Sequence, residues 1–351
     1  MYTNKWFLEQ ILGAIEGMKP KIQGLLEKPQ TQSLLNVMKM GHCAPSVMRT
    51  LQAFLELEDE GMLRATAGLP GGIGWLRAEC GCVTSPIMIL GLKYGEEVFS
   101  DGNGEIPRII PIGQRYLNRF RARYGGIDCR EIGKVDYNDK EAVKTYVLGT
   151  FLPCFRAICG GPGLLMDLIE EDLKVSPPDM DSEPVKAYSK LLRTFRDNKF
   201  HCSQSVLHEL DDLINVDEKL LRESWGFLGG TLLQGMTCGA LTGGVLAIGL
   251  RFGDIEDSYG RVLRWMLQLF MDGDIKREDL NKFNRSVNIS QELATWFEGE
   301  FGNTKCYDLT KADFGTREGV DRYLSENKLD YCRGVVENTA KKVREIIKEH
   351  Q

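Results

Sequence analysis

The chain has 351 residues, of which 42% are hydrophobic and 27% are charged, and its formal net charge is -6. This composition is typical of a globular protein of two ordinary domains and excludes a disordered, fibrous or basic nucleic-acid-binding chain. The N-terminal apolar pattern carries Glu9 and Glu16 and has no small-residue cleavage site, so we expect a cytoplasmic protein without a signal peptide. In that reducing compartment the ten cysteines are expected to be core residues, metal ligands or redox thiols.

Helical spacing dominates the chain from its N-terminus onward. Apolar residues recur three and four positions apart in segments such as VMRTLQAFLELE, RYLNRFRARY and VVENTAKKVREIIKEH, and strand-like alternation persists nowhere. We therefore predict an all-α fold. The predicted organisation is an N-terminal helical extension at 1–37, a first repeat at 38–173, a linker at 174–185 and a second repeat at 186–351.

The two repeats are recognised by matching residues at matching spacings. His42 and Cys43 match His201 and Cys202, and glycines, cysteines and threonines downstream recur at one constant offset. In the first copy these are Gly68, Gly71, Gly72, Cys80, Gly81, Thr84, Gly91, Leu92 and Gly95, and in the second Gly226, Gly229, Gly230, Cys238, Gly239, Thr242, Gly249, Leu250 and Gly253. Each copy carries four cysteines in register, namely Cys43, Cys80, Cys129 and Cys154 in the first and Cys202, Cys238, Cys306 and Cys332 in the second.

The linker and an insertion complete this organisation. The linker KVSPPDMDSEPV contains prolines and acidic residues, which predict irregular structure. The second copy is longer between its second and third cysteines, where YGRVLRWMLQLFMDG shows helical spacing, so an extra helix is expected there. Because single-copy relatives of tandem proteins often dimerise, we expect the two helical-bundle repeats to pack together as an intramolecular pseudo-dimer.

Prolines indicate where the first two cysteines of a copy lie relative to helices. Proline is tolerated in a first helical turn but breaks a helix interior. Pro45 therefore predicts a helix that begins beside Cys43. Pro86 predicts a helix start near Ser85, which leaves Cys80 in the preceding turn.

The last two cysteines are placed by the same reasoning. Pro153 and the possible cap Asp330 place Cys154 and Cys332 in a first helical turn. The third cysteine, Cys129 or Cys306, follows glycine or asparagine residues that end helices, so we expect it in a loop.

Cysteines near helix N-termini are expected to have a lowered pKa, because the free amides and the helix dipole there favour the thiolate. An isolated cysteine is more often a small buried hydrophobic residue. The retention of all four positions in two diverged copies favours a function for the set. His42 and His201, which precede the first cysteine of each copy, are candidates for a ligand, a proton donor or a thiolate partner.

The second copy resembles the C_GCAxxG_C_C family of redox-active proteins. The resemblance is carried by Cys202-Ser203-Gln204-Ser205-Val206, by Cys238-Gly239-Ala240-Leu241-Thr242-Gly243, and by Cys306 and Cys332. The first copy departs from the pattern, because Cys82 replaces the alanine, Ser85 replaces the second glycine and Pro45 stands in place of Gln204.

The resemblance implies a redox role with an unknown redox partner and no defined substrate. Similar proteins are fused to haem-binding segments that carry an iron-sulfur cluster, so a cluster is a candidate cofactor here. The sequence has no Cys-x-x-Cys-His segment for covalent haem. We therefore expect an electron carrier or an oxidoreductase.

Three chemistries are compatible with the cysteine pattern. Four thiolates per repeat suit an iron-sulfur cluster or another thiophilic metal, and a structural zinc site would use the same ligands. Thiol-disulfide exchange without metal would need only two thiols, with Cys202 and Cys238 as the redox candidates. The candidate metal ligands are the eight repeat cysteines, Cys43, Cys80, Cys129, Cys154, Cys202, Cys238, Cys306 and Cys332, and the further cofactor-binding candidates are His42, His201, Gly239 and Gly243.

Two cysteines occur in the first copy alone. Cys82 lies two positions after Cys80 and would either extend the site into a Cys-x-Cys arrangement or pack in the core, and Cys159 is expected to be a core residue.

The uncharged run from Gly226 to Leu250 is long enough to span a bilayer, but its many glycines and the charged counterpart in the first copy argue against a span. Gly235, Gly239 and Gly243 recur every four residues, a spacing that permits close approach to the backbone. The run is predicted to be a glycine-lined turn presenting Cys238, followed by a buried helix.

Overall fold

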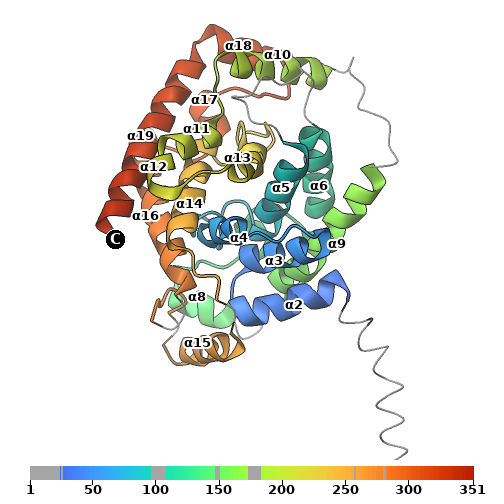
Figure 1. Ribbon diagram of the computed structural model, residues 1–351, viewed down its shortest axis with the longest axis vertical. Helices are drawn as coiled ribbons and strands as arrows, with labels where there is room; N and C mark the ends of the chain where they lie inside the picture. The colour runs from blue at the N-terminus through green and yellow to red at the C-terminus, as the bar shows by residue number, and fades with distance from the viewer. Residues whose placement is uncertain are drawn as a thin grey trace, which may run out of the picture.

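The computed structural model describes residues 24, 27–95, 108–146, 151–172, 183–256, 258–272, 274–279 and 282–351. Within these ranges the chain is helical, and β pairing is limited to two isolated bridges. The predicted all-α fold is therefore confirmed. Figure 1 shows the helices of the first repeat beside those of the second, with α5 and α14 in the interior of the molecule.

The predicted N-terminal extension at 1–37 lies outside the described residues except for 24 and 27–37, and α2 runs from its end into the predicted first repeat. The described elements of this part of the chain are all helices. They are α2 (Pro29–Met40), α3 (Cys43–Leu55), α4 (Glu60–Ala65), η1 (Thr66–Gly68), α5 (Gly81–Tyr94), α6 (Ile109–Tyr124), α7 (Cys129–Ile132), α8 (Lys140–Thr145) and α9 (Leu152–Asp172).

The second repeat has the same order of elements as the first, with two differences. Its elements are α10 (Glu183–Asp197), α11 (Cys202–Glu209), α12 (Asp211–Ile214), α13 (Glu218–Ser224), η3 (Trp225–Phe227), α14 (Gly239–Phe252), α15 (Tyr259–Asp272), α16 (Phe283–Phe301), α17 (Cys306–Thr310), α18 (Arg317–Ser325) and α19 (Lys328–Glu349). Helices α11 and α12 together correspond to α3, and one helix is inserted. The inserted helix is α15, as expected. The end of the predicted linker is already helical, because α10 tolerates Pro184 in its first turn.

Helices α5 and α14 form the centre of the core. Along α14 every residue from Gly239 to Gly249 is buried, because it packs on α11, α16 and α19 of its own repeat and on α4 and η1 of the other. Burying a large apolar side chain stabilises the fold by roughly 1.5–3 kcal/mol. Because α14 is buried on all sides, packing inside the protein explains why this run carries no charge.

One helix in the described ranges, α9, is long and apolar enough to cross a membrane by length and composition. It packs against α2, α6, α3 and α5, and 44% of its most apolar window is buried. These contacts are those of a helix that belongs to the helical bundle.

Pro86 does not begin a helix, so the prediction of a start near Ser85 is wrong. Helix α5 begins at Gly81, directly after its N-cap Cys80, and Pro86 lies inside it. A proline there leaves the carbonyl oxygen of Cys82 without its helical donor. The hydroxyl of Tyr116 donates to that oxygen at 2.7 Å and so replaces the missing bond.

The third cysteines also begin helices, where the sequence predicted loops. Cys129 is the first residue of α7 and Cys306 the first residue of α17. In α7 the side chains of Asp128 and Glu131 form a reciprocal capping box, which stabilises a helix too short to show periodicity in the sequence.

Contacts between the repeats are reciprocal. Helix α5 packs on α13 and η3, while its counterpart α14 packs on α4 and η1. A Cβ on Gly91 would meet the backbone of Arg222 and Glu223, and one on Gly249 would meet the backbone of Arg64 and Ala65. Reciprocity of this kind is the pattern that a two-fold relation produces.

A residue near the centre of this interface contacts its own counterpart. Glu79 precedes Cys80, and Thr237 occupies the same place before Cys238. The Glu79 carboxylate is buried and accepts hydrogen bonds from the backbone N–H of Thr237 at 2.9 Å and from its hydroxyl. The second cysteines of the two repeats therefore lie next to one shared polar contact.

We expect Gly91→Ala to lower the free energy of unfolding by about 1–3 kcal/mol, because the new Cβ would lie 2.5 Å from the Arg222 carbonyl oxygen. Urea denaturation measures this. The control Gly299→Ala adds a Cβ with nothing within 4 Å and should stabilise its helix by up to about 1 kcal/mol. Equal stabilisation by both substitutions would contradict the close helix contact.

Candidate thiolate centre

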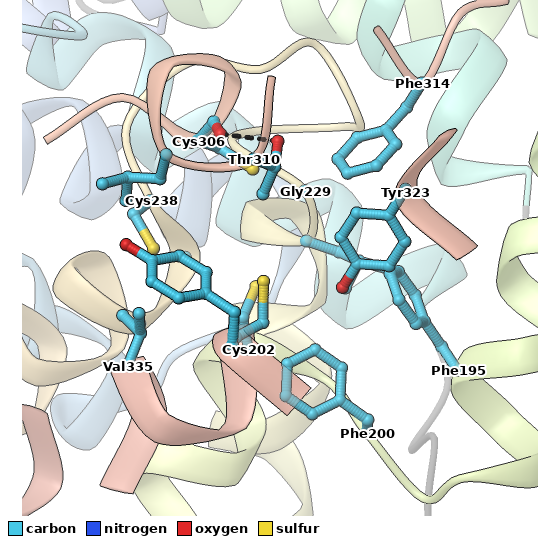
Figure 2. A pocket seen from close by; sticks show the side chains of 16 residues that line it. Phe195, Phe200, Cys202, Gly229, Cys238, Cys306, Thr310, Phe314, Tyr323 and Val335 are labelled. Carbon is cyan, nitrogen blue, oxygen red and sulfur yellow. Dashed lines mark hydrogen bonds between the residues drawn. The ribbon is translucent and has the colours of Figure 1, made fainter. Parts of the chain in front are cut away.

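The four cysteines of the second repeat line one cavity of about 30 Å³ (Figure 2). Apart from the sulfurs, its walls are mainly aromatic and aliphatic, and no charged side chain lines it. The principal apolar walls are Phe195, Phe200, Phe314, Tyr323, Tyr331 and Val335. The structure thus brings together Cys202, Cys238, Cys306 and Cys332, which are distant in sequence.

In each repeat an isolated β-bridge pairs the residue before the second cysteine with the residue before the third cysteine. Thr237 pairs with Lys305, so that the N–H of Cys238 donates to the Thr304 carbonyl at 2.8 Å and the N–H of Cys306 to the Met236 carbonyl at 2.7 Å. In the first repeat Glu79 pairs with Asp128 in the same way.

Close packing of α11 on α14 places the first cysteine. A Cβ on Gly239 would overlap Cys202 Sγ, and one on Gly243 would lie 2.7 Å from the Ser203 carbonyl oxygen. Gly239 lines the cavity, whereas Gly243 holds the two helices together from outside it. The close approach of α11 to α14 leaves no space for a side chain at Gly239 or Gly243, the two glycines of the pattern.

Backbone N–H groups point at the sulfurs. Ser203 and Gly229 donate to Cys202, and Ala240 and Leu241 donate to Cys238. In the first repeat Ala44 and Gly71 donate to Cys43 in the same manner. Such donors stabilise a thiolate more than a thiol.

The glycine donors belong to a left-handed turn that the sequence analysis missed. All residues over 71–75 and over 229–233 have positive φ, including Ile73, Trp75 and Leu232. Each non-glycine residue in this conformation costs roughly 1–2 kcal/mol, so the turn is maintained against strain. The recurring Gly71-Gly72 and Gly229-Gly230 pairs were its signal in the sequence.

The expected lowering of cysteine pKa values is wrong, because burial outweighs the helix dipole. Burial raises the pKa of Cys332 to about 12 and that of Cys154 to about 11, and it also raises the pKa of Cys202 and Cys238. A helix N-terminus stabilises a nearby thiolate by up to about 2 kcal/mol. Full burial raises a thiol pKa by roughly 3–5 units, which corresponds to about 4–7 kcal/mol against the thiolate. Burial thus favours the neutral thiol over the thiolate at each of these sulfurs.

The first repeat gathers its cysteines too. The thiols of Cys43 and Cys80 hydrogen-bond each other, and those of Cys80 and Cys82 do likewise. The last two are held by phenols, since Tyr137 lies 3.2 Å from Cys129 Sγ and Tyr146 bonds to Cys154. Cys159 lies apart, half-exposed on α9, and only burial affects its pKa.

A tyrosine also bonds to the fourth cysteine of the second repeat. Tyr323 donates to Cys332, as its counterpart Tyr146 does to Cys154. Neither tyrosine was predicted from the sequence, although Tyr146 and Tyr323 lie at the same spacing after Cys129 and Cys306.

The rings of both candidate histidines bond to groups outside the set of repeat cysteines. His201 caps α11, accepting the Gln204 N–H at Nδ1 (3.3 Å) while Nε2 bonds to the Trp225 carbonyl at 3.1 Å. His42 Nε2 bonds to Asn284 Oδ1 at 2.7 Å. Neither lines the cavity of the second repeat.

In the described part of the chain no three His, Cys, Asp or Glu side chains are spaced to enclose a metal ion as they stand. Sγ atoms move when a cysteine rotates about its Cα–Cβ bond. Metal binding would therefore require the protonated sulfurs to lose protons and rotate toward one another.

We expect acid to destabilise the protein between pH 6.5 and about 4. Burial lowers the pKa of His201 to about 3 and that of His42 to about 4, so both stay neutral in the folded chain while the unfolded chain takes up protons below pH 6.5. The stability is complete above pH 6.5 and falls as the pH falls.

His201→Asn, which keeps a capping side chain, should remove roughly 2–3 kcal/mol of the loss between pH 7 and pH 4.5, measured by urea denaturation at each pH. His208→Asn, on the exposed face of α11, is the control for loss of a histidine from this helix, and the His201 variant should differ from it. An unchanged slope in the His201 variant would contradict burial of a neutral ring.

Comparison with known proteins supports the repeat organisation. The family model described as "Putative redox-active protein (C_GCAxxG_C_C)" matches residues 41–159 and again residues 200–346. Comparisons with curated proteins and with solved structures found no match. Because the two matched regions cover more than half of the sequence and contain all eight repeat cysteines, the chain belongs to the C_GCAxxG_C_C family as a tandem duplication.

Proposed function

We propose that each repeat uses its four cysteines to hold a thiophilic metal, as an iron-sulfur cluster or a single iron ion, and that the protein transfers electrons. The observation that carries this proposal is the meeting of four sequence-distant cysteines on one apolar cavity. Family membership supports redox chemistry of this cysteine set. We further infer that the reciprocal contacts make the two repeats an intramolecular pseudo-dimer.

The four cysteine sulfurs are chemically suited to binding a thiophilic metal. Four thiolates buried without a counter-charge would repel one another and lack solvation. No lysine, arginine or histidine lines the second cavity to neutralise them, so the charge of a metal would do so. The backbone donors at Cys202 and Cys238 are arranged to stabilise sulfur in its anionic form.

The cavity size bears on the kind of centre. A volume of about 30 Å³ corresponds to roughly two water positions, so a single ion fits between rotated sulfurs. A cluster, which brings its own sulfide ions, would need the walls to move outward. Cys332 is half-buried and its neighbour Tyr331, which also lines the cavity, is 40% exposed, so the α19 wall of the cavity reaches solvent.

The bound metal would supply the electron-accepting orbital, and the residues around it would set its properties. The aromatic walls exclude water, the N–H groups and phenols donate hydrogen bonds to the ligand sulfurs, and the buried bridges fix Cys238 and Cys306. Hydrogen bonds and low polarity are the protein's main controls on the potential of a thiolate centre.

Thiol-disulfide chemistry is the second candidate, and the contact between Cys43 and Cys80 favours it in the first repeat. The two thiols would lose two electrons and two protons to a disulfide or quinone acceptor and form one S–S bond. The raised pKa values of these buried thiols oppose it, because the thiolate is the attacking species. A structural zinc site would use the same ligands without redox activity.

Anaerobic purification followed by iron, acid-labile sulfide and zinc analysis tests the proposal. We expect brown protein that contains iron, and Cys238→Ser should reduce the iron of one repeat, because it removes one of the four cysteines that line the cavity. The control Cys159→Ser lies outside the cysteine cluster and should retain full iron. Colourless, metal-free protein that loses thiols in pairs on mild oxidation would support disulfide chemistry instead, and zinc alone would indicate a structural site.

We expect Tyr323→Phe to lower the midpoint potential of the second centre by roughly 20–60 mV, measured by anaerobic spectroelectrochemical titration. The phenol bond to Cys332 stabilises the more negative, reduced state, and its loss removes about 0.5–1.5 kcal/mol. Tyr331→Phe is the matched control, since Tyr331 lines the same cavity but is 40% exposed. Equal shifts in both variants would contradict a specific role for Tyr323.

A further inference from the structure

Cys82 corresponds in the repeat register to a residue that lines the cavity of the second repeat. Its counterpart at the constant offset of the repeat is Ala240, the alanine of the family pattern. Ala240 lines the cavity of the second repeat together with the four cysteines. The equivalent position in the first repeat therefore presents sulfur where the second repeat presents a methyl group.

The contacts of Cys82 agree with this placement. Its side chain is fully buried and hydrogen-bonds to Cys80, which in turn bonds to Cys43. It is also close enough to Cys129 and Cys154 for charges on those sulfurs to affect it. Cys82 thus touches the cysteine cluster directly.

The backbone at Cys82 is held in place. The Tyr116 hydroxyl, itself buried, donates to the carbonyl oxygen that Pro86 leaves free in the first turns of α5. The counterparts in the second repeat are Ala240 for the cysteine and Gly244 for the proline. The first repeat therefore carries an extra sulfur on a turn of α5 whose backbone is bonded to Tyr116.

We propose that Cys82 is a fifth sulfur ligand of the first repeat, and that the two repeats therefore bind soft metal ions with different ligand sets, five sulfurs available in the first and four in the second. The inference rests on the proposed function. Thiophilic ions such as Cd²⁺ or Fe²⁺ prefer thiolate ligands and would displace the thiol protons on binding.

The test is a Cd²⁺ titration of the reduced, metal-free full chain, with affinities from chelator competition and the two sites distinguished by ¹¹³Cd NMR. Cys82→Ala reproduces the second-repeat residue, and we expect it to weaken binding at the first site by at least about tenfold and to shift only that signal. The opposite exchange, Ala240→Cys, should strengthen the second site and shift only the second signal.

Cys159→Ala is the control for loss of a cysteine near the first site, and it should change neither affinity by more than about twofold. Two wild-type Cd²⁺ signals that remain unchanged in Cys82→Ala would overturn the inference while leaving the proposed function intact. Absence of Cd²⁺ binding by the wild-type chain in both repeats would overturn the proposed function and the inference with it. If Cys82→Ala alters folding, Ala240→Cys decides the question. Tighter Cd²⁺ binding at the second site would support the inference, and unchanged Cd²⁺ affinity there would overturn it.

Discussion

The cost of burying thiolates is the constraint on which the rest of this structure depends. Cys202, Cys238 and Cys306 lie almost wholly inside the second repeat, in surroundings that raise their pKa values. Helix N-termini and N–H groups aimed at the sulfurs recover only part of the lost solvation. In both repeats a strained left-handed turn supplies one of these donors, Gly71 to Cys43 and Gly229 to Cys202.

Much of the fold was predictable because it depends on local periodicity and on the repeat. Helical spacing identified the all-α fold and the inserted α15, and matched residues identified the two repeats. Two local predictions were wrong for non-local reasons. Tyr116, distant in sequence, compensates for Pro86 inside α5, and the isolated bridge between Glu79 and Asp128 positions the start of α7. Neither contact leaves a periodic pattern in the sequence.

The sequence predicted which cysteines form the candidate site, but it did not predict the direction of their pKa shifts. The matching positions of the two copies identified the four cysteines that line the second cavity. The direction of their pKa shifts depends on burial, which is known only from the packed fold. The histidines show the same limit, because their adjacency to Cys43 and Cys202 did not reveal that their rings bond to Asn284 and to the Trp225 carbonyl.

Duplication within one chain allows the two sites to differ while their shared interface is retained. Glu79 and Thr237 are counterparts that hydrogen-bond each other beside Cys80 and Cys238, an unsymmetrical pairing that two identical subunits could not make. X-ray absorption spectroscopy of the anaerobically purified protein tests the central claim most directly. The account predicts iron with a first shell of sulfur alone, near 2.3 Å. A shell of nitrogen and oxygen, or protein that purifies without metal, would contradict it.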